Sequence, residues 1–68
     1  MQDWKLLYCT KNLTEANIIK GMLEENNIPA QLLNKQDSSY LVFGEIEIYV
    51  PIHLKSIAEG LVHRALFN

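Results

Sequence analysis

Residues 45–50 read Glu-Ile-Glu-Ile-Tyr-Val, so polar and apolar side chains alternate at every step. Successive side chains of a β-strand point to opposite faces of its sheet, and this pattern predicts a strand with one face buried. Ile46, Ile48 and Val50 should face a core. The two glutamates and Tyr49 should face outward. The stretch therefore predicts a sheet that is covered on one side.

The residues that follow this strand predict a helix. Pro51 can occupy a first helical position, where its missing N–H is not needed. Apolar residues then recur at the spacing that puts them on one helix face. They are Leu54, Ile57, Ala58, Leu61, Val62, Ala65 and Leu66. We expect this helix to be the main core element, with Leu61 at its centre.

The first third of the chain predicts a strand followed by a helix. Residues 4–10 are dense in aromatic and apolar side chains and too few for a packed helix, which favours a strand. Asn12 and Glu15 have the spacing of a capping box, in which each side chain satisfies a free N–H at a helix start. Apolar residues at helical spacing follow: Ala16, Ile19, Met22 and Leu23.

The middle of the chain predicts a short strand and a loop. Asn26-Asn27 can end the first helix, and Pro29 prevents its continuation. Residues 30–34 are a strand candidate. The segment from residue 35 to residue 44 is longer than a tight hairpin turn and joins this strand to the next one.

The predicted order is strand, helix, strand, strand, helix. Two helices with apolar faces need a sheet to lie on, and right-handed crossovers put both on the same face. We therefore expect a single domain, residues 1–68, with an α+β fold: a two-layer βαββα sandwich, ferredoxin-like with the fourth strand missing. The outer edge of the first strand would then be unpaired.

The composition describes one small globular domain and excludes several functions. A chain of 68 residues is too short for a second hydrophobic core. Six Lys and Arg against eight Asp and Glu give a net charge of −2, which offers no field to attract a nucleic acid. One cysteine and two histidines allow no intramolecular disulfide and no clustered metal ligands, so we expect neither a metal nor a cofactor. No signal peptide and no apolar run of about 20 residues is visible, so we expect a cytoplasmic protein with no membrane span.

Three isolated features have simple structural explanations. Cys9 has no histidine near it in the chain to generate a thiolate, so we expect a small buried or half-buried apolar role. Gly21 and Gly60 each interrupt a predicted helix, where glycine is unfavourable. Close packing of the helices would explain both glycines.

Glu45 and Glu47 lie two residues apart on one strand face. Such a pair can share a metal or act as acid and base if the face is enclosed. On an open face the pair only keeps the sheet solvated, with Lys5 as the cross-strand neighbour that offsets its charge. We favour the second interpretation.

The connecting loop holds the best site candidate. Asp37, Ser38, Ser39 and Tyr40 gather polar groups without an evident structural task. They can form an Asx-type turn or a recognition surface, and both interpretations stay open. Because loops on a rigid scaffold often carry function, we take these four residues and Glu45 as candidate ligand- or partner-binding residues. We expect no catalytic residue.

Several motifs together carry a resemblance to a known family. They are Tyr8 and Thr10, Asn12 with Glu15-Ala16, Lys20-Gly21 with Leu23-Glu24, Asn27-Ile28-Pro29-Ala30, the stretch from Asn34 to Tyr40, and the stretch from Gly44 to Pro51. In their order and spacing the chain resembles the small bacterial domains called putative prokaryotic signal-transducing proteins. The resemblance implies a fold similar to that of PII-type nitrogen regulators and a regulatory or binding role. It brings no established ligand and no catalytic residues, and because the long loop and basic phosphate cluster of PII proteins are not visible here, ATP binding is not implied.

These observations together predict a non-catalytic regulatory or binding module whose partner is a protein or a small molecule. Two alternatives are an accessory dimerisation or assembly domain and a small enzyme that uses Asp37, Glu45 and Glu47. The open sheet face should carry Leu33, Tyr49 and either Leu6 or Leu7, an apolar surface that favours cover by a second copy. We therefore predict a homodimer, paired through this face or through the edge of the first strand.

Overall fold

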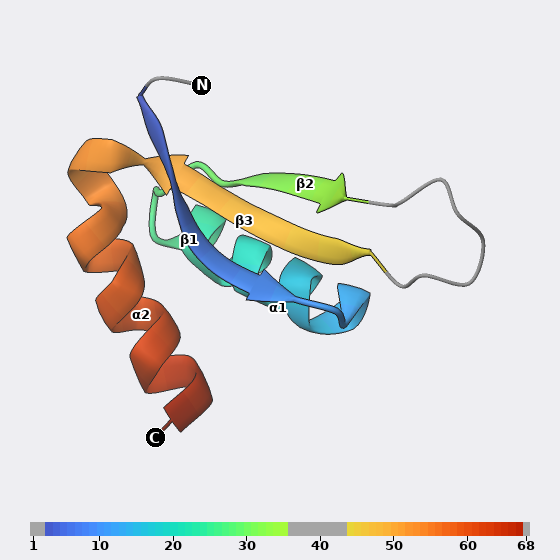
Figure 1. Cartoon of the computed structure of the whole chain (residues 1–68). Helices are drawn as coiled ribbons and strands as arrows, with labels where there is room; N and C mark the ends of the chain where they lie inside the picture. Colours follow the sequence, from blue (N-terminus) through green and yellow to red (C-terminus); the bar gives the residue numbers. More distant parts are fainter. Residues whose placement is uncertain (1–2, 36–43, 68) are drawn as a thin grey trace.

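The computed structural model describes residues 3–35 and 44–67 of the chain. Its elements are β1 (Trp4–Thr10), α1 (Leu13–Glu25), β2 (Gln31–Lys35), β3 (Glu45–Pro51), a 3-10 turn (Ile52–Leu54) and α2 (Lys55–Phe67). The three strands form one antiparallel sheet in the order β1-β3-β2 (Figure 1). The predicted α+β architecture is confirmed, and this arrangement is consistent with a ferredoxin-like fold.

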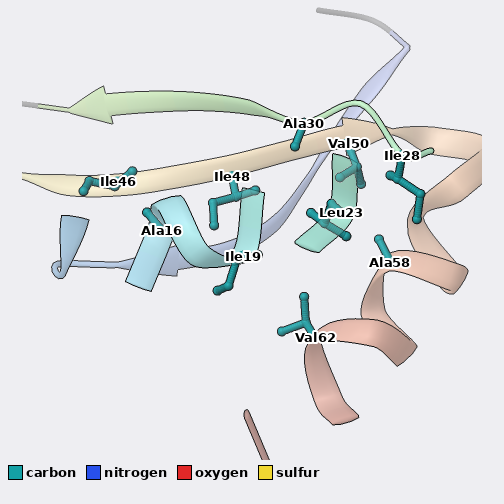
Figure 2. Close-up of a cluster of buried hydrophobic side chains, with 10 residues drawn as sticks. All are labelled: Ala16, Ile19, Leu23, Ile28, Ala30, Ile46, Ile48, Val50, Ala58 and Val62. Carbon is teal, nitrogen blue, oxygen red and sulfur yellow. The ribbon is translucent and has the colours of Figure 1, made fainter. Parts of the chain in front are cut away.

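The core lies between one face of the sheet and the two helices. From β3, the alternate residues Ile46, Ile48 and Val50 are buried, as their spacing predicts. Figure 2 shows Ile48 and Val50 directed from the strand toward the helix layer. The remaining buried apolar residues are Ala16, Ile19 and Leu23 of α1, Ile28 and Ala30 of the following segment, and Ala58 and Val62 of α2.

Helix α2 contributes less to this core than its sequence pattern predicts. Only Ala58 and Val62 are buried in it, Leu61 is half-buried, and Ile57 is 58% exposed. The helix lies beside β1 at the border of the sheet (Figure 1). Its Ala58 and Val62 belong to the buried cluster, and its Leu61 and Leu66 are only partly buried against it. The prediction that α2 is the main core element, centred on Leu61, is wrong; β3 and α1 supply most of the core.

Strand β1 contains an irregularity that turns two consecutive side chains to the core. Leu6 pairs with Tyr49 and Tyr8 pairs with Ile48, so Leu7 is an extra residue between them, as in a β-bulge. Both Leu7 and Tyr8 pack against the buried cluster. Leu6 is left on the opposite face, 39% exposed.

Both ends of α1 are capped as the sequence predicts. The Asn12 Oδ1 accepts a hydrogen bond from the Glu15 N–H at 3.1 Å, which is half of a capping box. At the other end Asn27 adopts a left-handed φ of 63°, and the Ile28 N–H donates to the Leu23 carbonyl at 2.9 Å. This is the hydrogen-bond pattern of a Schellman motif, in which an apolar contact between the same two positions is typical. It places Ile28 in the core.

The two helical glycines are not explained by close packing. A Cβ atom added to Gly21 or to Gly60 would meet no atom within 4 Å beyond its chain neighbours and the backbone of its own helix. The expectation of a tight helix contact at these positions is therefore wrong.

Candidate functional site

The face of the sheet that points away from the helices exposes Leu6 and Leu33 and is the candidate recognition surface. Side chains that are paired across neighbouring antiparallel strands share a face. The register therefore puts one set of residues on this side, which we call the open face. Its members are Trp4, Leu6, Cys9, Gln31, Leu33, Glu45, Glu47 and Tyr49. Figure 1 views the sheet from this side, with α1 behind it.

The centre of the open face combines a polar pair with apolar flanks. The Tyr49 hydroxyl donates a hydrogen bond to Glu47 Oε1 at 3.0 Å, and both side chains are half-buried. Leu6 lies opposite Tyr49 on one side and Leu33 lies opposite Glu47 on the other. These leucines are 39% and 41% exposed. A surface with exposed leucines around an oriented hydroxyl and carboxylate is suited to contact with another macromolecule.

A shallow hollow lies at the end of β1, next to the start of β3. Its volume is about 210 Å³, and Cys9, Thr10, Lys11 and Glu45 line it. Pockets that enclose a small organic ligand typically have volumes of about 300–1,000 Å³. The hollow could therefore hold part of a ligand or one side chain of a partner.

The structure describes one of the five predicted site residues, Glu45. Glu45 is the first residue of β3, is exposed, and lines the hollow. Asp37, Ser38, Ser39 and Tyr40 lie outside the described residues, so the loop prediction stays a prediction.

Two predictions about neighbours of this site are wrong. Lys5 pairs with Val50 on the helix side of the sheet, and Cys9 is the residue opposite Glu47. Lys5 therefore does not offset the charge of the glutamates. Cys9 is exposed rather than buried, because the extra residue in β1 shifts its place in the register.

A contact that sequence analysis missed joins β1 to the start of α1. The Tyr8 hydroxyl donates to Glu15 Oε1 at 3.3 Å. Burial raises the pKa of the Tyr8 phenol above its ordinary value, and the nearby Glu15 carboxylate and its hydrogen bond raise this pKa further. The neutral phenol is therefore the form that the fold stabilises. The bulge, which turns Tyr8 inward, had no signal in the sequence.

The described residues form neither a metal-ligand cluster nor a membrane-spanning helix. Among the residues that the structure describes, no three His, Cys, Asp or Glu side chains are grouped so that they could hold a metal ion. Neither described helix is long and apolar enough to cross a membrane.

A protein-family model matches most of the described chain. The matching family model covers residues 4–62 and is described as "Putative prokaryotic signal transducing protein". The chain belongs to this family. The match confirms the resemblance that the sequence motifs indicate, and the family description points to signal transduction without naming a ligand, a partner or an enzyme activity. Comparisons with curated proteins and with solved structures gave no significant match.

Proposed function

We propose that this member of the signal-transducing family is a non-catalytic binding module that recognises a protein partner through its open face. The observation that carries the proposal is the one-sided sheet, whose helix side is packed and whose other side exposes Leu6 and Leu33 around Tyr49. Apolar side chains on a rigid sheet lose little conformational entropy on binding, which favours their use as anchors. A recognition role for Asp37, Ser38, Ser39 and Tyr40, which lie outside the described residues, is part of the same proposal.

The surroundings of the two glutamates support a role without catalysis. An acid and base pair needs an enclosed site in which the reacting groups are shielded from water. Glu45 is exposed at the strand end, and the Glu47 carboxylate accepts the hydrogen bond of Tyr49 on a face that neither described helix covers. The enzyme alternative therefore has less support than binding. The small hollow likewise favours a protein partner over an enclosed small molecule.

The proposal has two further parts, a location and an oligomeric state. We place the module in the cytoplasm, in agreement with its single cysteine, and we propose that it forms a homodimer. An assembly domain that only dimerises is the alternative, and it predicts no further partner.

Native mass spectrometry of the tagged chain, purified from extract of its own host, tests the binding proposal. We expect a complex whose added mass is that of a protein other than a second copy of this chain. The double variant Leu6→Ser, Leu33→Ser should no longer carry this bound protein. The control Leu13→Ser combined with Ile18→Ser changes leucine and isoleucine residues of α1 that are 56% and 65% exposed, and should keep it. Equal loss in both double variants, or an added mass of small-molecule size, would contradict a protein-binding open face.

A further inference from the structure

The two edges of the sheet differ in how they could accept another strand. β1 and β2 each pair only with β3 among the described strands, so each has one outer edge. Ile52, the residue directly after β3, donates its N–H to the Asp3 carbonyl at 2.8 Å, so its backbone groups point toward β1. The N–H and C=O groups of successive residues in a strand alternate in direction. Those of the even-numbered residues of β3 therefore point toward β1, and those of the odd-numbered residues point toward β2.

This alternation identifies the backbone groups at each outer edge. In β2, Gln31 and Leu33 pair with Tyr49 and Glu47 and thus point their N–H and C=O groups toward β3. Leu32 and Asn34 consequently point theirs outward. In β1, Lys5 pairs with Val50, so its backbone N–H and C=O groups point toward β3. By the same alternation the backbone groups of Trp4 and Leu6 point away from β3, toward the outer edge.

The edge of β1 opposes pairing with a second copy. A two-fold antiparallel pairing that stays within the strand and before the bulge must match Trp4 with Leu6 of the other copy. Lys5 would then lie directly opposite the partner's Lys5, and like charges in such a pair are destabilising. A pairing that extends further would cross the extra residue at Leu7. A lysine and a bulge are devices by which natural sheets protect an edge.

The edge of β2 has no bulge between Gln31 and Lys35, and its register is self-complementary. Its one lysine, Lys35, would lie opposite Gln31 of the second copy and not opposite another lysine. If the two-fold axis passes through Leu33, all five residues of the strand find a partner, from Gln31 opposite the second copy's Lys35 to Lys35 opposite the second copy's Gln31. Leu32 and Asn34 of one copy then exchange hydrogen bonds with Asn34 and Leu32 of the other. The two Leu33 side chains form the central pair on the open face, without hydrogen bonds between them, where the strands approach most closely. No like charges are placed opposite each other.

We infer that a second copy of this chain docks antiparallel along the outer edge of β2, centred on Leu33, and forms a continuous six-stranded sheet. The strand order across the two protomers would be β1-β3-β2-β2-β3-β1, with all helices on one face and both open faces joined on the other. The inference rests on the proposed homodimer and gives it an interface. It covers the exposed Leu33, while Leu6 remains available at the outer ends of the joined face.

A pair of charge variants tests the interface in sedimentation equilibrium. The contact area of one strand pair is small, so we expect dimerisation in the range of about 10–500 µM. Leu33→Lys places like charges at the dimer centre and should weaken the dimer at least about tenfold. Leu6→Lys is the matched control, since Leu6 has nearly the same exposure on the same face but lies in β1. It should leave the dimer unchanged. Equal weakening by both variants would indicate face-to-face packing and would overturn the edge interface.

Amide hydrogen exchange across the same concentration range gives a second, independent test on the unmodified chain. The amides of Leu32 and Asn34 should become protected as concentration rises, because they point away from β3 and toward the second copy. The Leu33 amide, already paired with β3, should be protected throughout. Protection that appears at Trp4 and Leu6 instead would place the second copy on β1 and overturn the inference. A wild-type chain that stays monomeric at 500 µM would also overturn it, while the partner mass in the extract experiment would still decide the binding proposal separately.

Discussion

Replacing both helical glycines by alanine should stabilise the protein, although sequence analysis alone predicts the opposite. Gly21 lies in α1 and Gly60 lies in α2, each inside its helix. A helix interior prefers alanine to glycine by about 0.5–1 kcal/mol, because glycine loses more backbone entropy on folding. At either position the added Cβ meets no atom within 4 Å beyond its chain neighbours and its own helix backbone, so no steric penalty offsets this gain.

The expected size of the effect follows directly. The two sites lie on different helices and should act additively, so the double variant should gain about 1–2 kcal/mol in free energy of unfolding. For a domain of this length each kcal/mol raises the melting temperature by about 4–8 °C, which predicts a rise of about 4–16 °C. The total stability of such a domain is only about 3–10 kcal/mol, so the change is easily measured.

Chemical and thermal denaturation of the two single variants and the double variant measure this gain. Gly21→Ser and Gly60→Ser serve as controls, because serine adds a similar Cβ with a lower helix propensity and should gain less. A lower denaturation midpoint for either alanine variant would refute the reasoning. It would mean that the helix meets a neighbour at that glycine, as in the close packing that the sequence pattern suggests.

Three other changes test the fold. Ile48→Ala should cost about 2–5 kcal/mol because Ile48 is fully buried in the central strand, whereas Leu61→Ala should cost less because Leu61 is half-buried; equal denaturation midpoints for the two variants would contradict the assigned core. Stability contributed by Tyr8 should be fully present below pH 10 and lost as pH rises through the raised pKa of its phenol, so urea midpoints from pH 8 upward should fall more steeply for wild type than for Tyr8→Phe. Parallel curves would show that the hydrogen bond to Glu15 does not couple to folding. Asn27→Ala should lower stability by about 1 kcal/mol, because alanine tolerates the left-handed φ of 63° less well than asparagine, and an unchanged melting temperature would argue against that conformation.

Much of the fold could be predicted from local patterns. The period of two in residues 45–50 assigns Ile46, Ile48 and Val50 to the core, because neighbouring side chains of any strand point to opposite faces. The cap at Asn12 and the stop at Asn27 depend on hydrogen bonds over three to five residues, which the sequence specifies locally. For the candidate site, the same period placed Glu45, Glu47 and Tyr49 together on the open face.

Other features depended on contacts between distant segments, which no local pattern contains. The bulge in β1 arises in the pairing with β3, and only that register decides that Leu7 faces the core while Leu6 and Cys9 face outward. The apolar stripe of α2 specifies a face but not its neighbours, so the exposure of Ile57 follows from the place of the helix at the border of the sheet. The sequence thus determined which side of each element is apolar, because backbone geometry alone sets that periodicity. Only the tertiary structure decided which apolar sides are covered, because burial requires a second surface brought close by the rest of the chain.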